Sequence, residues 1–98
     1  MRTLRLLKYL NRINLDVEIE ETERFQYTFF MLSELRIWEN EFYQYQIGLF
    51  DSDEFEARTN THRDQLTIKS NVAVWERYKH WFAPDFRIYM NELLDEIS

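Results

Sequence analysis

The stretch WENEFYQYQIGLFD, residues 38–51, holds the clearest helix end and the clearest helix start of the chain. Trp38, Phe42 and Tyr45 are spaced by four and three residues, which places them on one face of a helix. Gly48 favours a helix end, because glycine readily adopts the left-handed conformation found there. Asp51 is a good N-cap and Glu54 follows at the third helical position, so the next helix should begin at residue 52. The stretch is therefore interpreted as the structural centre of a helical domain.

Continued towards the N-terminus, the pattern predicts one long helix over about residues 18–47. An apolar seam spaced by three and four residues runs along one side and comprises Tyr27, Met31, Leu35, Trp38, Phe42, Tyr45 and Leu49. We interpret this seam as core or subunit interface. A second apolar set on the opposite side comprises Phe25, Phe29, Leu32, Tyr43 and Ile47. A helix with two apolar sides is either central in its own bundle or shared between subunits.

Helical periodicity elsewhere predicts four more helices, over about residues 2–14, 52–67, 71–82 and 84–97. Ser70 or Asn71 is expected to cap the helix over 71–82, and Pro84 suits the first position of the last helix. The helix over 52–67 has a thin apolar stripe and is expected to be peripheral. The 98 residues contain one glycine and one proline, too few for a chain of strands and tight turns. We therefore predict a single all-α domain, residues 1–98, built as a bundle of about five helices.

Charge and composition exclude several classes of function. The net charge is −6, made up of +3 in residues 1–16 and −9 in the remainder. This balance argues against nucleic-acid binding, which needs a basic surface on the folded protein. The chain lacks a continuous apolar run of about 18 residues, so we expect no membrane span. It also lacks cysteine, which leaves no disulfide or thiolate site and is compatible with a cytoplasmic location.

The residue types needed for catalysis or metal binding are sparse. The two histidines are His62 and His80, and Glu76 lies four residues before His80 rather than in the Glu-x-x-His spacing of carboxylate-bridged metal bundles. None of the serines lies in a Gly-x-Ser-x-Gly turn, and one glycine cannot make a glycine-rich phosphate loop. We therefore predict no catalytic residues, no metal site, no cofactor and no enzymatic activity.

One polar group is not explained by packing alone. Arg36, Glu39 and Asn40 fall within the second apolar side of the long helix, and Arg36 can reach both of the others at i+3 and i+4. With Tyr43 they are candidates for a small-molecule ligand site, as a polar anchor in an aromatic-lined pocket. The alternative is an ion pair with an amide that fixes helix register or an interface.

Residues 38–55 resemble a family of uncharacterised bacterial proteins. The shared pattern reads ENxFYQYxxGLxD here, from Glu39 to Asp51, where the family has ENxYYQYxxGLLDEExW. Weaker similarity extends from about residue 15 to residue 97 and includes WFxPxFR, residues 81–87, where the family tends to read FSPEFR. Ala83 departs from the capping serine of the family, which should weaken the start of the last helix by about 0.5–2 kcal/mol.

The resemblance implies no activity, because the family has none assigned. Many members carry an additional N-terminal membrane helix, so this chain is either a short soluble version or a fragment of a longer protein. Short genes of this kind occur in mobile bacterial DNA, which raises an integron-type gene cassette as the origin.

Our leading hypothesis is a non-enzymatic helical module that self-associates, as a homodimer or a higher homo-oligomer, because the long helix has two apolar sides. The chain also carries more aromatic rings, 17% of its residues, than a small core needs. The competing hypothesis is a small-ligand-binding bundle that uses Arg36, Glu39, Asn40 and Tyr43. A third hypothesis, an acidic protein that mimics nucleic acid or binds basic partners, rests on the net charge alone.

Overall fold

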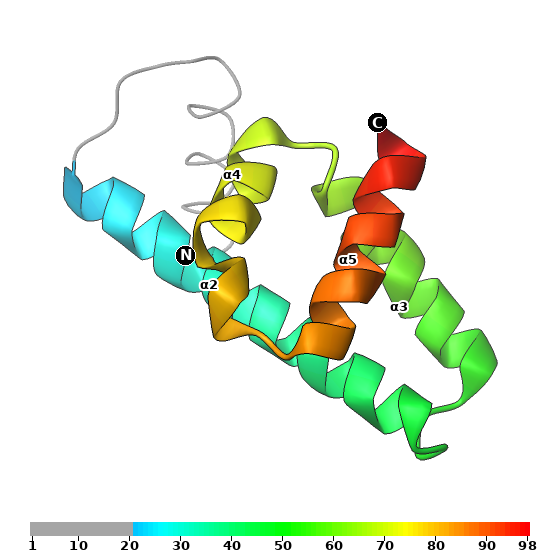
Figure 1. Cartoon of the computed structure of the whole chain (residues 1–98). Coiled ribbons are helices and arrows are strands. Elements are labelled where there is room, and N and C mark those ends of the chain that lie inside the picture. The colour runs from blue at the N-terminus through cyan, green and yellow to red at the C-terminus, as the bar shows by residue number, and fades with distance from the viewer. Residues whose placement is uncertain (1–20) are drawn as a thin grey trace.

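The computed structural model describes residues 21–98, which form four α-helices and one short 3-10 helix (Figure 1). In chain order they are α2 (Glu21–Gln46), α3 (Ser52–Gln65), α4 (Lys69–Tyr78), η1 (Lys79–Trp81) and α5 (Pro84–Ile97). Residues 21–98 contain no strand, which confirms the predicted all-α class. The fifth α-helix expected, over residues 2–14, lies outside the described residues, as do the first residues of the helix expected over 18–47.

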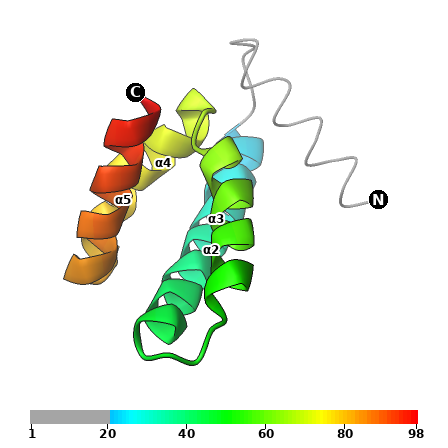
Figure 2. The ribbon, with the colours of Figure 1, turned by 90° about the vertical axis from the view of Figure 1, so that its right-hand side faces the viewer.

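The longest helix, α2, is the base on which the others lie (Figure 1). The helices α3, α4 and α5 all lie on one side of it, and the turned view places α3 along α2 with α4 and α5 beside the pair (Figure 2). The core fills the space between them and comprises Tyr27, Met31, Leu35, Trp38, Leu66, Val74, Trp75, Phe82, Phe86, Met90 and Leu93. One side of α2 therefore faces the core, whereas much of its opposite side is exposed apart from its contacts with the segment around η1.

The junction between α2 and α3 forms as the sequence predicts. Gly48 has a φ of 80°, and the amide of Leu49 donates to the carbonyl of Gln44 at 2.8 Å, which closes the helix with a Schellman motif. Asp51 caps α3, because its Oδ2 accepts a hydrogen bond from the amide of Glu54 at 3.1 Å. The rings of Phe50 and Phe55 then meet across the cap with centroids 6.0 Å apart, a hydrophobic staple.

The predicted bounds of α4 were wrong. The helix begins at Lys69 after Ile68, which offers no side-chain cap, and its last predicted turn is the 3-10 helix η1. The two polar residues expected as caps have other partners. The amide nitrogen Nδ2 of Asn71 donates to the carbonyl of Gln65 at 2.8 Å and so satisfies the end of α3. The hydroxyl of Ser70 lies 3.4 Å from that of Tyr27.

The last helix, α5, has the predicted bounds and begins with Pro84 in its first turn. Ala83 is its N-cap residue and makes no side-chain capping bond. A carboxylate from α2 contributes instead, because Oε2 of Glu39 accepts a hydrogen bond from the amide of Ala83 at 2.8 Å. Glu39 thus binds the amide of the N-cap residue, as the glutamate of a capping box does, whereas a capping serine would accept from the amides of the first helical turn.

Candidate functional sites on α2

The predicted apolar seam of α2 is buried over its N-terminal two thirds. Tyr27, Met31, Leu35 and Trp38 are all at most 3% exposed. Phe42 is half-buried and packs against the core. Tyr45 is 41% exposed and Leu49 is 75% exposed, so the seam leaves the core at its C-terminal end. There the ring of Tyr45 lies flat on Phe55 of α3, with centroids 4.3 Å apart, and forms the edge of the packed region.

Two residues of the predicted polar group, Arg36 and Glu39, form an ion pair, whereas Asn40 and Tyr43 take no part in it. Nη1 of Arg36 donates to Oε1 of Glu39 at 2.7 Å, while Oε2 of Glu39 accepts from Ala83. The guanidinium of Arg36 also lies 4.5 Å from the centroid of Phe82, a cation–π contact. This pair therefore fastens the segment before α5 to α2. Asn40 and Tyr43 are exposed on the same helix and are not part of these contacts.

A surface hollow of about 390 Å³ lies beside Arg36. Its lining comes from α2, η1 and the residue after η1, and comprises Phe29, Leu32, Ser33, Arg36, Ile37, Trp81 and Phe82. Arg36 is the member of the predicted ligand group that lines it. Glu39, Asn40 and Tyr43 do not line this hollow, and the ligand site with all four residues around it stays a prediction.

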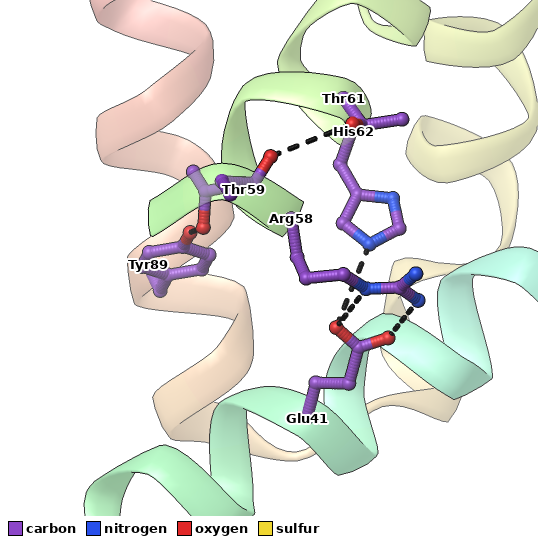
Figure 3. A network of polar contacts seen from close by, with 7 residues as sticks. Glu41, Arg58, Thr59, Thr61, His62 and Tyr89 are labelled. Atoms are coloured by element: carbon purple, nitrogen blue, oxygen red, sulfur yellow. Dashed lines mark hydrogen bonds and ion pairs between the residues drawn. The ribbon is translucent and has the colours of Figure 1, made fainter. Parts of the chain in front are cut away.

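The sequence reasoning missed a buried polar network between α2 and α3 (Figure 3). Glu41 of α2 accepts two hydrogen bonds from Arg58 of α3, one of them from Nε to Oε2 at 3.0 Å and the other from Nη2 to Oε1. Nε2 of His62 lies 3.9 Å from the same Oε2. Glu41 and His62 are 7% and 6% exposed, whereas the side chain of Arg58 is 49% exposed. The network is thus a bidentate ion pair with a buried imidazole beside it.

The imidazole of His62 is held in a largely apolar environment. Its ring stacks on the indole of Trp38, with centroids 4.5 Å apart and an interplanar angle of 20°. Burial lowers the pKa of His62 below its usual value, Glu41 partly opposes this effect, and Arg58 adds to it. His62 is therefore neutral at neutral pH. A sequence signal for its burial was present, because Phe55, His62 and Leu66 are spaced by seven and four residues and so share one side of a helix.

A second polar contact joins α3 to α5. The hydroxyls of Thr59 and Tyr89 lie 3.3 Å apart (Figure 3). The ring of Tyr89 also stacks on Phe42 of α2, with centroids 4.6 Å apart. Burial raises the pKa of Tyr89, so its hydroxyl remains protonated at neutral pH. These contacts and the ion pair hold α3 against α2 and α5. Both contacts therefore position the helices relative to one another.

We expect the free energy of unfolding to fall as the pH is lowered from 7 to about 5.5, because an unfolded histidine binds a proton near pH 6.5. The pKa of His62 is lower in the folded protein, so protonation favours the unfolded chain. The stabilisation that neutral His62 contributes is complete above the pKa of histidine in the unfolded chain. It is lost as the pH falls towards the lower pKa of His62 in the folded protein. Its slope reaches at most about 1.4 kcal/mol per pH unit for one proton.

Urea denaturation at a series of pH values measures this slope. In His62→Phe the slope should flatten over the same range, because no buried imidazole remains. The exposed His80 provides the matched control, and His80→Gln should keep the wild-type slope. Stability that rises on acidification, or a slope unchanged in His62→Phe, would contradict the assignment.

Opposite the buried seam, α2 carries a largely exposed apolar surface, which we call the outer face. It comprises Phe25, Phe29, Leu32, Arg36, Asn40, Tyr43 and Ile47. Its central part borders the core, because Leu32 is half-buried against it and Arg36 lies over Phe82. Phe25 is 63% exposed, Phe29 56%, Tyr43 58% and Ile47 51%. These four large apolar side chains form an extended surface along one helix, and the other residues of 21–98 leave it exposed to solvent.

Residues 21–98 bring together no group of three His, Cys, Asp or Glu side chains that could hold a metal ion. Within the same residues, no helix combines the length and the apolar composition that a membrane span requires. No protein-family model, curated protein or solved structure matches the chain. The resemblance carried by residues 38–55 therefore stays a prediction.

Proposed function

We propose that the protein is a non-enzymatic helical interaction module that self-associates through the outer face of α2. The observation that carries the proposal is the exposure of Phe25, Phe29, Tyr43 and Ile47, each more than half exposed on one helix. Burial of such side chains is favourable by about 25 cal/mol per Å² of apolar surface. A second copy that covers this face would remove all four from water at once.

The distribution of charge supports a second copy as the occupant. The chain has a net charge of −6, so two copies that meet through an average surface repel each other. Between Phe25 and Ile47, the charged side chains on the outer face and its borders are Arg36 and Glu39, which neutralise each other at 2.7 Å. The borders otherwise carry uncharged polar residues, namely Gln26, Thr28, Ser33, Gln44 and Gln46. Depletion of charge around aromatic residues is typical of the core of protein interfaces.

The buried networks described above fit the same proposal. The ion pair of Glu41 and Arg58 and the hydroxyl contact of Thr59 and Tyr89 fix the helices that support α2. A rigid helix presents its outer face with little loss of conformational entropy on association. A bacterial cytoplasmic location, the lack of nucleic-acid binding and a mobile gene cassette origin remain predictions that rest on the sequence.

Light scattering at micromolar concentration tests self-association directly. We expect a mass twice the 12.3 kDa of the chain. The double variant Phe29→Gln/Tyr43→Gln should shift the mass towards the monomer, because it replaces two apolar contacts with amides. The helical content should persist, since both side chains are more than half exposed.

Ile88→Gln is the matched control, because Ile88 is 59% exposed but lies on α5. It should leave the mass unchanged. A monomeric wild-type protein at every concentration would overturn the proposal and leave the outer face to another occupant, such as residues 2–14 of the same chain or a different protein. A mass equally reduced by Ile88→Gln would place the interface elsewhere.

A further inference from the structure

The outer face of α2 has a symmetric arrangement about Arg36. Phe25 and Ile47 each lie eleven residues from it, Phe29 and Tyr43 each lie seven, and Leu32 and Asn40 each lie four. Four, seven and eleven residues are close to one, two and three whole turns of a helix with 3.6 residues per turn. All these side chains therefore lie on the same side as Arg36, with equal spacing towards each end of the helix.

We infer that two copies pair through antiparallel α2 helices whose two-fold axis passes beside Arg36. In this arrangement a residue at a given distance before Arg36 meets the residue at the same distance after Arg36 in the second copy. Phe25 then meets Ile47 and Phe29 meets Tyr43, so large apolar side chains oppose each other at both ends of the interface. A parallel pair would instead place each residue opposite itself. The inference rests on the proposed self-association and specifies its partner and register.

The charges near the axis are compatible with this register. Arg36 meets its own copy there, and two unpaired guanidinium groups would repel. Each Arg36 already pairs with Glu39 of its own chain at 2.7 Å. Glu39 lies three residues, about 4.5 Å of helix rise, from Arg36, so it also comes near Arg36 of the second copy. The two-fold axis thus brings two cations and two carboxylates together as a neutral cluster.

The other occupants of the face do not require this symmetry. Equal spacing alone follows from helical periodicity on any helix face. The matching of side-chain type does not, since Phe25 meets Ile47 and Phe29 meets Tyr43, while Leu32 meets Asn40. A two-fold interface favours such matching, because the same patch on both copies must be complementary to itself. The apolar hollow beside Arg36, bordered by Trp81, lies next to the axis and offers space for side chains of the second copy.

Disulfide cross-linking tests the register without interference from native thiols, because the chain contains no cysteine. Arg36→Cys places one thiol beside the axis in each copy, and we expect a disulfide-linked dimer under mild oxidation. Asn40→Cys alone should not link to itself, because its equivalents lie about 12 Å apart along the helix and a disulfide requires Cα atoms within about 7 Å. A mixture of Asn40→Cys and Leu32→Cys should give the mixed disulfide.

Asn60→Cys on the exposed side of α3 is the control for random collision and should remain monomeric on a non-reducing gel. Light scattering of the same variants under reducing conditions distinguishes a wrong register from a lack of self-association. A dimer in which Asn40→Cys links to itself, or in which the mixture gives no product, would overturn the antiparallel register and leave self-association intact. Monomers throughout would overturn both the register and the proposed function.

Discussion

Replacement of Trp38 with alanine is expected to lower the free energy of unfolding by about 3–5 kcal/mol, the range for truncating a large buried ring. Trp38 is 2% exposed and is the point where three helices meet. Its indole stacks on His62 of α3 at 4.5 Å and meets Phe86 and Tyr89 of α5 at 5.8 and 6.0 Å. Since small domains are stable by only about 5–15 kcal/mol, this loss is a large share of the total.

Urea denaturation followed by far-ultraviolet circular dichroism, at one fixed protein concentration, measures the loss. Trp81→Ala is the matched control, because Trp81 is 55% exposed in η1 and its truncation leaves little cavity. It should cost less than about 1 kcal/mol, as surface substitutions usually do. Equal losses in the two variants, or an unchanged melting temperature in Trp38→Ala, would show that the indole of Trp38 does not hold the three helices together.

The parts of the fold that could be predicted from the sequence depend on residues close together in the chain. Gly48, Asp51 and Pro84 each act on the backbone within a few residues, so the end of α2, the start of α3 and the start of α5 are where the sequence places them. Helical spacing also assigned the two sides of α2, because the angle between residues on one helix is fixed by its geometry.

The parts that could not be predicted depend on residues far apart. Asn71 has the sequence signature of a cap, but its side chain binds the end of α3 instead of starting α4. Glu39 was paired with Arg36 from spacing alone, yet its second partner is the amide of Ala83, 44 positions further on. A helical wheel shows which residues share a side and cannot show which segment covers that side.

The same limit explains why the network of Glu41 was missed. Glu41 lies three residues after Trp38, at the border of the apolar seam, where an acidic residue is normally solvated. Its burial follows from the position of α3, which brings Arg58 and His62 over it. Only the contact across two helices turns an ordinary surface glutamate into part of a buried ion pair.

Replacement of Arg58 with methionine is expected to destabilise the protein more than replacement of Glu41 with glutamine, although the two residues form one ion pair. Without Arg58, the carboxylate of Glu41, whose side chain is 9% exposed in the native structure, loses both of the hydrogen bonds that it accepts from the guanidinium. Breaking a buried pair in this way costs about 3–5 kcal/mol. We expect a value near the lower end, because Arg58 is itself half exposed and water can reach its place. Without the charge of Glu41, the guanidinium of Arg58 is still hydrated, and the loss should be nearer about 1 kcal/mol.

Urea denaturation of both variants tests the asymmetry, with Glu41→Leu/Arg58→Met as the third arm. The double variant removes both charges and should recover much of the loss in Arg58→Met, because an apolar pair leaves no unpaired buried charge. A double variant as unstable as Arg58→Met would show that the lost packing of the Arg58 stem, rather than the unpaired carboxylate, causes the effect.

The pH dependence of Arg58→Met separates charge from packing in a second way. Arg58 helps to lower the pKa of His62, whereas Glu41 raises it. Removal of Arg58 leaves only Glu41 of the two, so His62 should bind a proton more readily in the folded state. The fall in stability between pH 7 and 5.5 should therefore be shallower in Arg58→Met than in the wild-type protein. If Arg58 acted through packing alone, the slope would not change, because the charges around His62 would contribute nothing to it.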